Sequence, residues 1–186
     1  VSSAVAAAAM ESGVARKPIE DLEQYRRDLS ARLDPTASTL QVIFDRISAN
    51  RKRVVFAEGE EEKVIRAAMA FRNAGYGEPI LVGREHRIRE TIEKLGLEGA
   101  EDIPLTNAKV SDHNEQYINF LYKKLQREGA LRRDCQRMVN LDRNVFGACM
   151  VLKGHADAMV TGVTRSFQPS FDQVTRVISP RKGRDF

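Results

Sequence analysis

The segment 161–166 carries the residue types in this sequence that best suit anion binding. Its candidate ligand-binding residues are Thr161, Gly162, Thr164, Arg165 and Ser166. The hydroxyls can donate hydrogen bonds, the guanidinium is a fixed fork of N–H groups, and the glycine lets the backbone approach a ligand closely. A helix is expected to follow, and its first amides are free to bind an anion. These features predict a site for a phosphate or a diphosphate.

A second interpretation of this segment stays open. Ser166 or Ser170 can simply cap the following helix, because a serine hydroxyl accepts a hydrogen bond from the first-turn amides. Arg165 then faces solvent. The residue types alone do not decide between a ligand site and an ordinary helix start.

A run of glutamates follows the first predicted strand, in the segment EGEEE at residues 58–62. Carboxylates are favourable near the positive end of a helix dipole, but they repel a phosphate. We interpret the run as a helix-capping feature and a signature of the fold rather than as a catalytic carboxylate cluster.

Other candidate centres are weaker. Gly75 and Gly77 lack the third glycine of a dinucleotide loop and precede a strand, so they predict a turn that ends a helix. His155 and Asp157 alternate on a strand without further ligands at metal spacing, and His155 is expected to be structural or exposed. We therefore predict no metal site in this chain. His86 and His113 are expected to be solvated, and Cys135 and Cys149 are expected to be reduced and mostly buried. We expect no chemical role for these four residues.

The elements that must position the segment 161–166 change in character near residue 50. Helices are predicted at about 1–13, 18–33 and 40–50, with Pro18 in a first turn and Asp34-Pro35 as a stop. Strands are then predicted at 54–57, 79–83, 103–105 and 156–160, with helices between them and a last helix at 171–178. Asp112 and Asp142 are expected to cap two of these helices.

Strands that alternate with helices predict an α/β fold, with a mainly parallel sheet flanked by helices. The sheet looks incomplete, since only three or four strands are visible. We expect two parts, a helical segment at residues 1–50 and an α/β region at residues 51–186. Ligands of such sheets bind beyond the carboxyl ends of the strands, which is where the segment 161–166 is expected.

Composition narrows the class of protein. The chain has 186 residues, of which 42% are hydrophobic and 30% charged, with a formal net charge of +4. Basic and acidic residues are interleaved, which is typical of solvated helix faces and argues against nucleic acid as a partner. No apolar run approaches the roughly 18 residues of a membrane span, and the Ala-rich start lacks the basic leader of a signal peptide. We expect a cytoplasmic protein that binds no membrane.

Several stretches resemble a known family. RVVFAEGEEEKVIRAA at residues 53–68 is similar to the opening strand and helix of phosphate acetyltransferases, and GHADAMVTG at residues 154–162 is similar to a later strand. DRNVFGACM at residues 142–150 and VTRS at residues 163–166 resemble the form fused behind bacterial malic enzymes. AVAAAAMESGVAR at residues 4–16, with Tyr25 beyond it, resembles the end of the malic-enzyme catalytic half.

The resemblance implies a truncated phosphotransacetylase-like region of a multidomain, NADP-dependent malic enzyme. It implies a fold like that of isocitrate and isopropylmalate dehydrogenases, incomplete here, with residues 1–50 linking it to the catalytic half. The catalytic residues of both chemistries are expected outside this chain. NAD(P) and a divalent metal belong to the absent catalytic half, and the fragment alone is expected to be inactive.

Three functions follow from the resemblance. In the first, the region binds acetyl-CoA as an allosteric inhibitor of malate oxidation and builds a homo-oligomer, based on dimers, beside the catalytic domain of the same full-length chain. In the second, it is an active phosphate acetyltransferase that makes acetyl phosphate and CoA. In the third, it is a purely structural dimerisation module. The first is the leading hypothesis, with Arg165 contacting a phosphate of acetyl-CoA.

Overall fold

The computed structural model describes residues 2–33, 35–181 and 183–184, and within it the chain forms two compact units, Val1–Asn50 and Arg51–Phe186. The first unit is helical, as predicted. It contains α1 (Ser2–Glu11), α2 (Leu22–Leu33) and α3 (Pro35–Ala49). The origin of this unit in a malic-enzyme catalytic half stays a prediction.

The helix expected from residue 18 begins later than predicted. α2 starts at Leu22, because the Asp21 carboxylate accepts a hydrogen bond from the Gln24 amide at 2.9 Å and so caps the first turn. Pro18 and Ile19 therefore precede the helix. Asp34, part of the predicted stop, lies outside the described residues.

The second unit is built on a four-stranded sheet in the order β3-β2-β1-β4, and every neighbouring pair is parallel. The strands are β1 (Lys52–Phe56), β2 (Gly77–Val82), β3 (Leu105–Thr106) and β4 (Ala158–Val160). In the register, Val55 of β1 lies opposite Ile80 of β2 and Met159 of β4. This confirms the predicted α/β class. β3 has only two residues, and it is shorter and later than the strand expected at 103–105.

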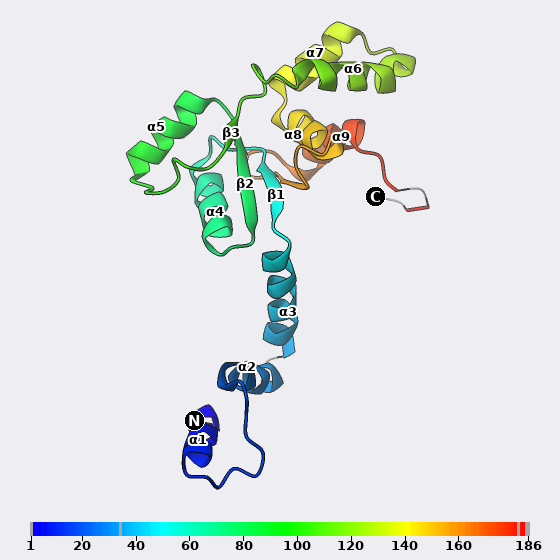
Figure 1. Ribbon diagram of the computed structural model, residues 1–186. Coiled ribbons are helices and arrows are strands. Elements are labelled where there is room, and N and C mark those ends of the chain that lie inside the picture. Colours follow the sequence, from blue (N-terminus) through cyan, green and yellow to red (C-terminus); the bar gives the residue numbers. More distant parts are fainter. Residues whose placement is uncertain (1, 34, 182, 185–186) are drawn as a thin grey trace. The chain divides into compact units, whose positions relative to one another are not determined.

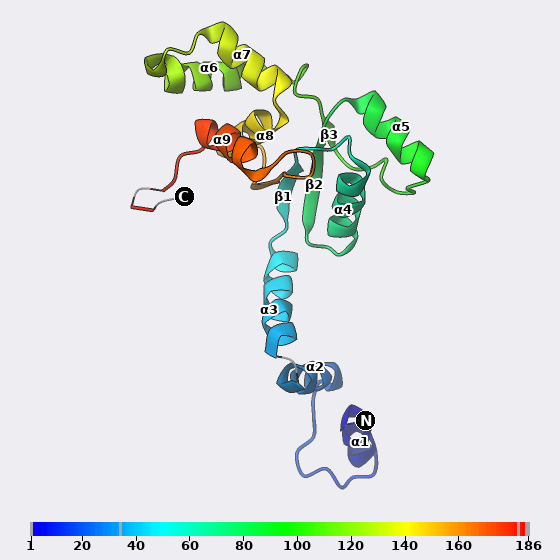
Figure 2. The same cartoon turned by 180° about the vertical axis from the view of Figure 1, so that it is seen from behind.

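Helices cover both faces of the sheet (Figures 1 and 2). One face carries α4 (Glu62–Asn73) and α5 (Glu85–Leu95), and the other carries α6 (Asn114–Leu125), α7 (Arg132–Leu141), α8 (Arg143–Leu152) and α9 (Phe167–Val177). A single 3-10 turn, Gln126–Glu128, follows α6. Successive strand residues point to opposite faces, so Leu81 packs in the α4–α5 core while its neighbour Val82 packs in the larger core on the other face.

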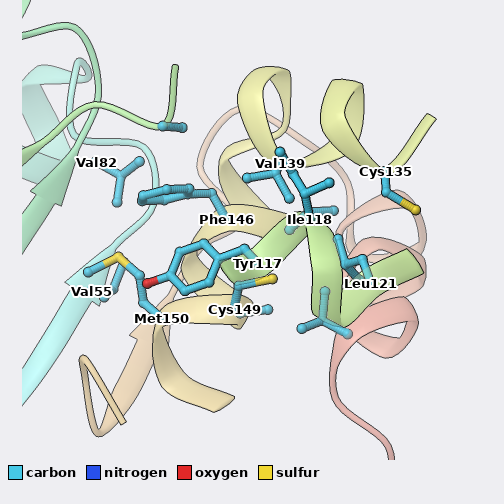
Figure 3. Close-up of a cluster of buried hydrophobic side chains, with 14 of the residues drawn as sticks. Val55, Val82, Tyr117, Ile118, Leu121, Cys135, Val139, Phe146, Cys149 and Met150 are labelled. Atoms are coloured by element: carbon cyan, nitrogen blue, oxygen red, sulfur yellow. The ribbon is translucent and has the colours of Figure 1, made fainter. Parts of the chain in front are cut away.

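The larger core joins the sheet to α6, α7, α8 and α9. Figure 3 shows Val55 and Val82 from the strands beside Phe146 and Tyr117 from α8 and α6. Tyr117 and Phe146 meet edge to face, with ring centroids 5.5 Å apart. Cys135 and Cys149 lie in the same core as buried free thiols, and burial raises the pKa of Cys149 to about 12. Such thiols are poor nucleophiles, because the thiolate is the reactive form.

Two helix starts differ from the sequence prediction. Asp112 does not cap α6, whose first turn follows a turn closed by the Asn114 amide bonding to the Ser111 carbonyl. α9 begins at Phe167 rather than 171, with Ser166 in an extended conformation just before it. Pro169 then lies in the first helical turn, where the missing N–H costs nothing. The prediction that Asp142 caps α8 is confirmed, since its carboxylate accepts from the Asn144 and Val145 amides.

Candidate ligand site at the carboxyl edge of the sheet

The predicted anion-binding segment 161–166 connects edge strand β4 to α9, the orange stretch of Figure 2. It therefore lies at the carboxyl edge of the sheet, the usual place for a ligand in a parallel α/β fold. Gly162 has a φ of 118°, a backbone conformation that other residues rarely adopt. The five predicted site residues thus share one tight loop that begins with a required glycine.

The loop wraps around the side chain of Glu58, which sequence reasoning had assigned to a separate junction. Oε2 of Glu58 accepts from the amides of Gly162 at 2.9 Å and Val163 at 2.6 Å. Oε1 accepts from the Thr164 amide at 2.8 Å and from the Thr164 hydroxyl. Glu58 is only 4% exposed. The turn after β1 and the loop after β4 are therefore one hydrogen-bonded structure.

Glu58 is held in its charged form despite its burial. Burial alone would raise the pKa of its carboxyl, but the hydrogen bonds from Thr164, Val163 and Gly162 outweigh burial and lower the pKa below its ordinary value. Hydrogen bonds to the ionised form stabilise that form. The loop therefore surrounds a permanent negative charge at neutral pH.

The rest of the glutamate run does not cap α4 as predicted. Glu61 precedes the helix but makes no side-chain capping bond, and Glu62 pairs with Arg66 on the helix surface. Glu60 accepts from both the backbone and the guanidinium of Arg84, which lowers the pKa of Glu60 to about 2. The capping interpretation is wrong for Glu58 and Glu60, because each carboxylate finds its donors on a neighbouring loop.

Arg165 is neither buried nor simply solvated. Its side chain is 38% exposed, and Nη1 lies 3.1 Å from Oδ2 of Asp142. The other oxygen of Asp142 caps α8, so one carboxylate both starts a helix and holds the arginine. An ion pair this exposed is worth at most about 1 kcal/mol, so a ligand anion can compete for the guanidinium.

Thr161 is also engaged. Its hydroxyl donates to Oδ1 of Asn144 at 2.6 Å, and the Asn144 amide donates to Gln173 at 2.8 Å. Asn144 is buried, and this polar chain ties β4, α8 and α9 together. Sequence reasoning missed Asn144, and no local signal marks it, because its partners lie 17 and 29 residues away.

A pocket of about 600 Å³ opens between β4, the loop and α9. Thr161, Gly162 and Arg165 line it, whereas Thr164 and Ser166 do not. The remaining lining residues are mostly apolar: Met159, Val160, Phe167, Ser170, Phe171 and Val174. Of the described residues that line the pocket, Arg165 alone carries a charge.

Neither Ser166 nor Ser170 caps α9, although the sequence suggested both as helix caps. Ser166 precedes α9 but makes no side-chain capping bond. Ser170 is 6% exposed, lines the pocket, and has no hydrogen-bond partner for Oγ among the described residues. A buried hydroxyl without a partner is costly, so Ser170 is a polar group available to a ligand.

His155 lies in a ring cluster that the sequence did not reveal. It shares a 2.5 Å hydrogen bond through Nδ1 with the Tyr117 hydroxyl, and its ring stacks on His113 with centroids 3.9 Å apart. The structural role predicted for His155 fits these contacts. His113 is exposed as expected, but its ring packs on His155 rather than standing alone in solvent.

This cluster should make stability fall in weak acid. Burial, followed by the electrostatic effects of His113, Arg53 and Lys153, lowers the pKa of His155. The neutral form of His155 is therefore favoured in the folded protein. Its contribution to the free energy of unfolding is complete above the unfolded-state pKa of about 6.5 and is lost as pH falls below that value, with a slope of at most about 1.4 kcal/mol per pH unit.

Urea unfolding at pH 7.5 and at pH 5.5 measures this loss of stability. His155→Gln should flatten the pH dependence and His86→Gln should not. An unchanged slope in His155→Gln would contradict the assignment.

No group of three or more His, Cys, Asp or Glu side chains in the described parts of the chain is arranged to hold a metal ion. Among the described helices, none has the length and apolarity to cross a bilayer.

Some known proteins are similar to this chain in sequence, and a solved structure is similar to it in architecture. The phosphate acetyl/butaryl transferase family matches residues 38–186. An NADP-dependent malic enzyme of Rhizobium meliloti is 50% identical over 98% of the chain, and a probable NADP-dependent malic enzyme of Rickettsia prowazekii is 47% identical over 99%. The chain spans 24% of the length of each. The EutD phosphotransacetylase structure from Staphylococcus aureus superposes on 81% of this chain and 44% of its own, with a TM-score of 0.72 and 26% identity.

The match to the solved structure includes less than half of that chain, so the sheet described here is part of a larger fold, as the sequence predicted. The family match begins inside α3 and runs through every strand and the loop 161–166. The chain therefore belongs to the phosphate acetyl/butaryl transferase family, as a phosphotransacetylase-like region of the kind found within malic enzymes.

Proposed function

We propose that this chain is the regulatory and oligomerisation region of a cytoplasmic malic enzyme, which oxidatively decarboxylates malate to pyruvate. Acetyl-CoA is the allosteric inhibitor that the region binds. NAD(P) and a divalent metal act in a catalytic half outside this chain, and the region alone has no catalytic activity. The near-complete alignment of this chain with about a quarter of two malic enzymes supports the proposal.

The observation that carries the proposed ligand is the pocket with Arg165 on its wall. Acetyl-CoA joins phosphate groups to a long, largely apolar arm that carries amide groups. Arg165 can bind a phosphate, the apolar lining can take part of the arm, and the Ser170 hydroxyl can bond to one of its polar atoms. Thr161 and Gly162 line the same pocket. Thr164 and Ser166 act indirectly, by shaping the loop.

Inhibition requires more than binding. The effector must bind one state of the assembly more tightly than another, because equal affinity shifts no equilibrium. Breaking the pair between Arg165 and Asp142 is one local change that ligand binding would bring, and Asp142 also begins α8. This contact is therefore a candidate link between the ligand and the packing of α8 in the large core.

An oligomerisation role is supported by a different observation in the helical unit. Leu40 and Ile43 of α3 lie one helical turn apart and are both exposed, and neighbouring exposed apolar side chains are typical of surfaces that bind another protein. We propose a homo-oligomer based on dimers, and this role can coexist with acetyl-CoA regulation.

The deciding experiment uses a malic enzyme that contains this region. Malate oxidation is titrated with acetyl-CoA while acetyl phosphate formation is assayed in parallel, and acetyl-CoA binding to the 186-residue chain is measured by calorimetry. We expect saturable inhibition without acetyl transfer. Acetyl phosphate formation would instead favour an active phosphate acetyltransferase, and the absence of both effects would leave a structural dimerisation module.

A further inference from the structure

The loop 162–164 has the donor arrangement of an anion-binding nest. Three successive backbone amides and the Thr164 hydroxyl converge on one carboxylate, with two donors for each of its oxygens. Successive backbone N–H groups that point into one concavity form an anion site in many phosphate-binding proteins. Here the bound anion is the side chain of Glu58.

Backbone hydrogen bonds to two neighbouring strands fix the position of Glu58. β1 lies between β2 and β4, and its pairing with β4 continues through the Ala57 amide, which bonds to the Val160 carbonyl at 3.0 Å. Gly59, the residue after Glu58, is hydrogen-bonded to β2, because its amide donates to the Val82 carbonyl at 3.0 Å. A Cβ on Gly59 would lie 2.9 Å from that carbonyl oxygen, so glycine is needed there.

We infer that the loop 162–164 is an anion-binding nest permanently filled by Glu58, which acts as a positioning residue and keeps external phosphate out of the nest. The inference holds whether or not the effector is acetyl-CoA. If the proposed function is also correct, the phosphate of the effector is held from the Arg165 side of the loop and not by the loop amides.

Removing the carboxylate should convert the nest into a binding site for a small anion. Thermal unfolding of the whole 186-residue chain is measured with and without inorganic phosphate, and separately with acetate, for wild type and three variants. Glu58→Ala should unfold at a lower temperature than wild type. Phosphate should then raise its Tm by about 5–10 °C when present at a hundred times its Kd.

The controls separate nest occupancy from a general salt effect. Glu58→Gln keeps the side chain in the nest, so it should be destabilised but not rescued by phosphate or acetate. Glu62→Ala removes an exposed glutamate of the same run, and its Tm should respond to phosphate as wild type does. If phosphate raises the Tm of Glu58→Ala no more than that of wild type, the inference is overturned.

A measurement on the wild-type chain covers the case in which Glu58→Ala does not fold. The amide proton resonances of Gly162, Val163 and Thr164 should shift together in a pH titration, with one midpoint below the ordinary glutamate pKa. At pH 7 millimolar phosphate should leave the Gly162 and Val163 resonances in place, since these two residues do not adjoin Arg165. Independent midpoints, or a phosphate-induced shift of these two amides, would show that Glu58 does not fill the nest. Neither experiment measures acetyl-CoA binding, so its outcome is distinct from that of the proposed function.

Discussion

Replacing Arg165 by alanine should raise the concentration of acetyl-CoA needed for half-maximal inhibition of the malic enzyme by about ten- to a hundredfold. A hydrogen bond from a charged group is worth about 1.5–3 kcal/mol, and each 1.4 kcal/mol is a factor of ten in affinity. Arg165 is the one charged residue among the described residues that line the pocket, so no neighbouring lining residue can take its place. Inhibition curves, together with calorimetry on the 186-residue chain, measure the change.

Two control variants make this result specific to the pocket. Arg66→Ala removes another ion-paired arginine, which binds Glu62 on α4, and it should leave acetyl-CoA inhibition unchanged. Asp142→Asn should act in the opposite direction and tighten binding a few-fold. Asparagine still caps α8, but it no longer competes as a charge for Arg165. Unaltered inhibition in Arg165→Ala would exclude this residue from the effector site.

Replacing Phe146 by alanine should cost about 3–5 kcal/mol of unfolding free energy, the usual range for a buried aromatic ring. Phe146 is fully buried in the core of Figure 3, where it contacts Tyr117 edge to face. A typical domain is stable by only about 5–15 kcal/mol, so this loss is a large share of the total. Urea unfolding followed by circular dichroism measures it.

Phe167→Ala is the matched control for this prediction. Phe167 is 75% exposed and stacks on Phe171 with ring centroids 5.3 Å apart, so its loss should cost less than about 1.5 kcal/mol. Similar losses for the two phenylalanines would contradict the packing described for α8. This matters for the site, because α8 also carries Asp142 before its first turn and Asn144 within it.

The sequence by itself determined the class of the fold. A buried strand such as β1 and a helix with one apolar face such as α5 each have a recognisable spacing of apolar residues. This spacing involves residues only a few positions apart, so it is visible in the sequence. The α/β alternation, the Asp142 cap and the loop after β4 could all be predicted for this reason. Helix starts were harder to predict. α2 begins four residues later than expected, where Asp21 caps its first turn, and α9 begins four residues earlier than expected, after Ser166, which makes no side-chain cap.

Only the tertiary structure decided what the candidate site is. Glu58 and the amides it binds are separated by 104–106 residues, and they meet because the strand order places β4 directly beside β1. Strand order depends on packing of the whole sheet and leaves no local mark in the sequence. The same is true of the unpartnered Ser170 hydroxyl and of the contact between Arg165 and Asp142, 23 residues apart. Residue types therefore predicted where an anion could bind, and the packing of strands places one carboxylate of the protein, that of Glu58, against the same loop.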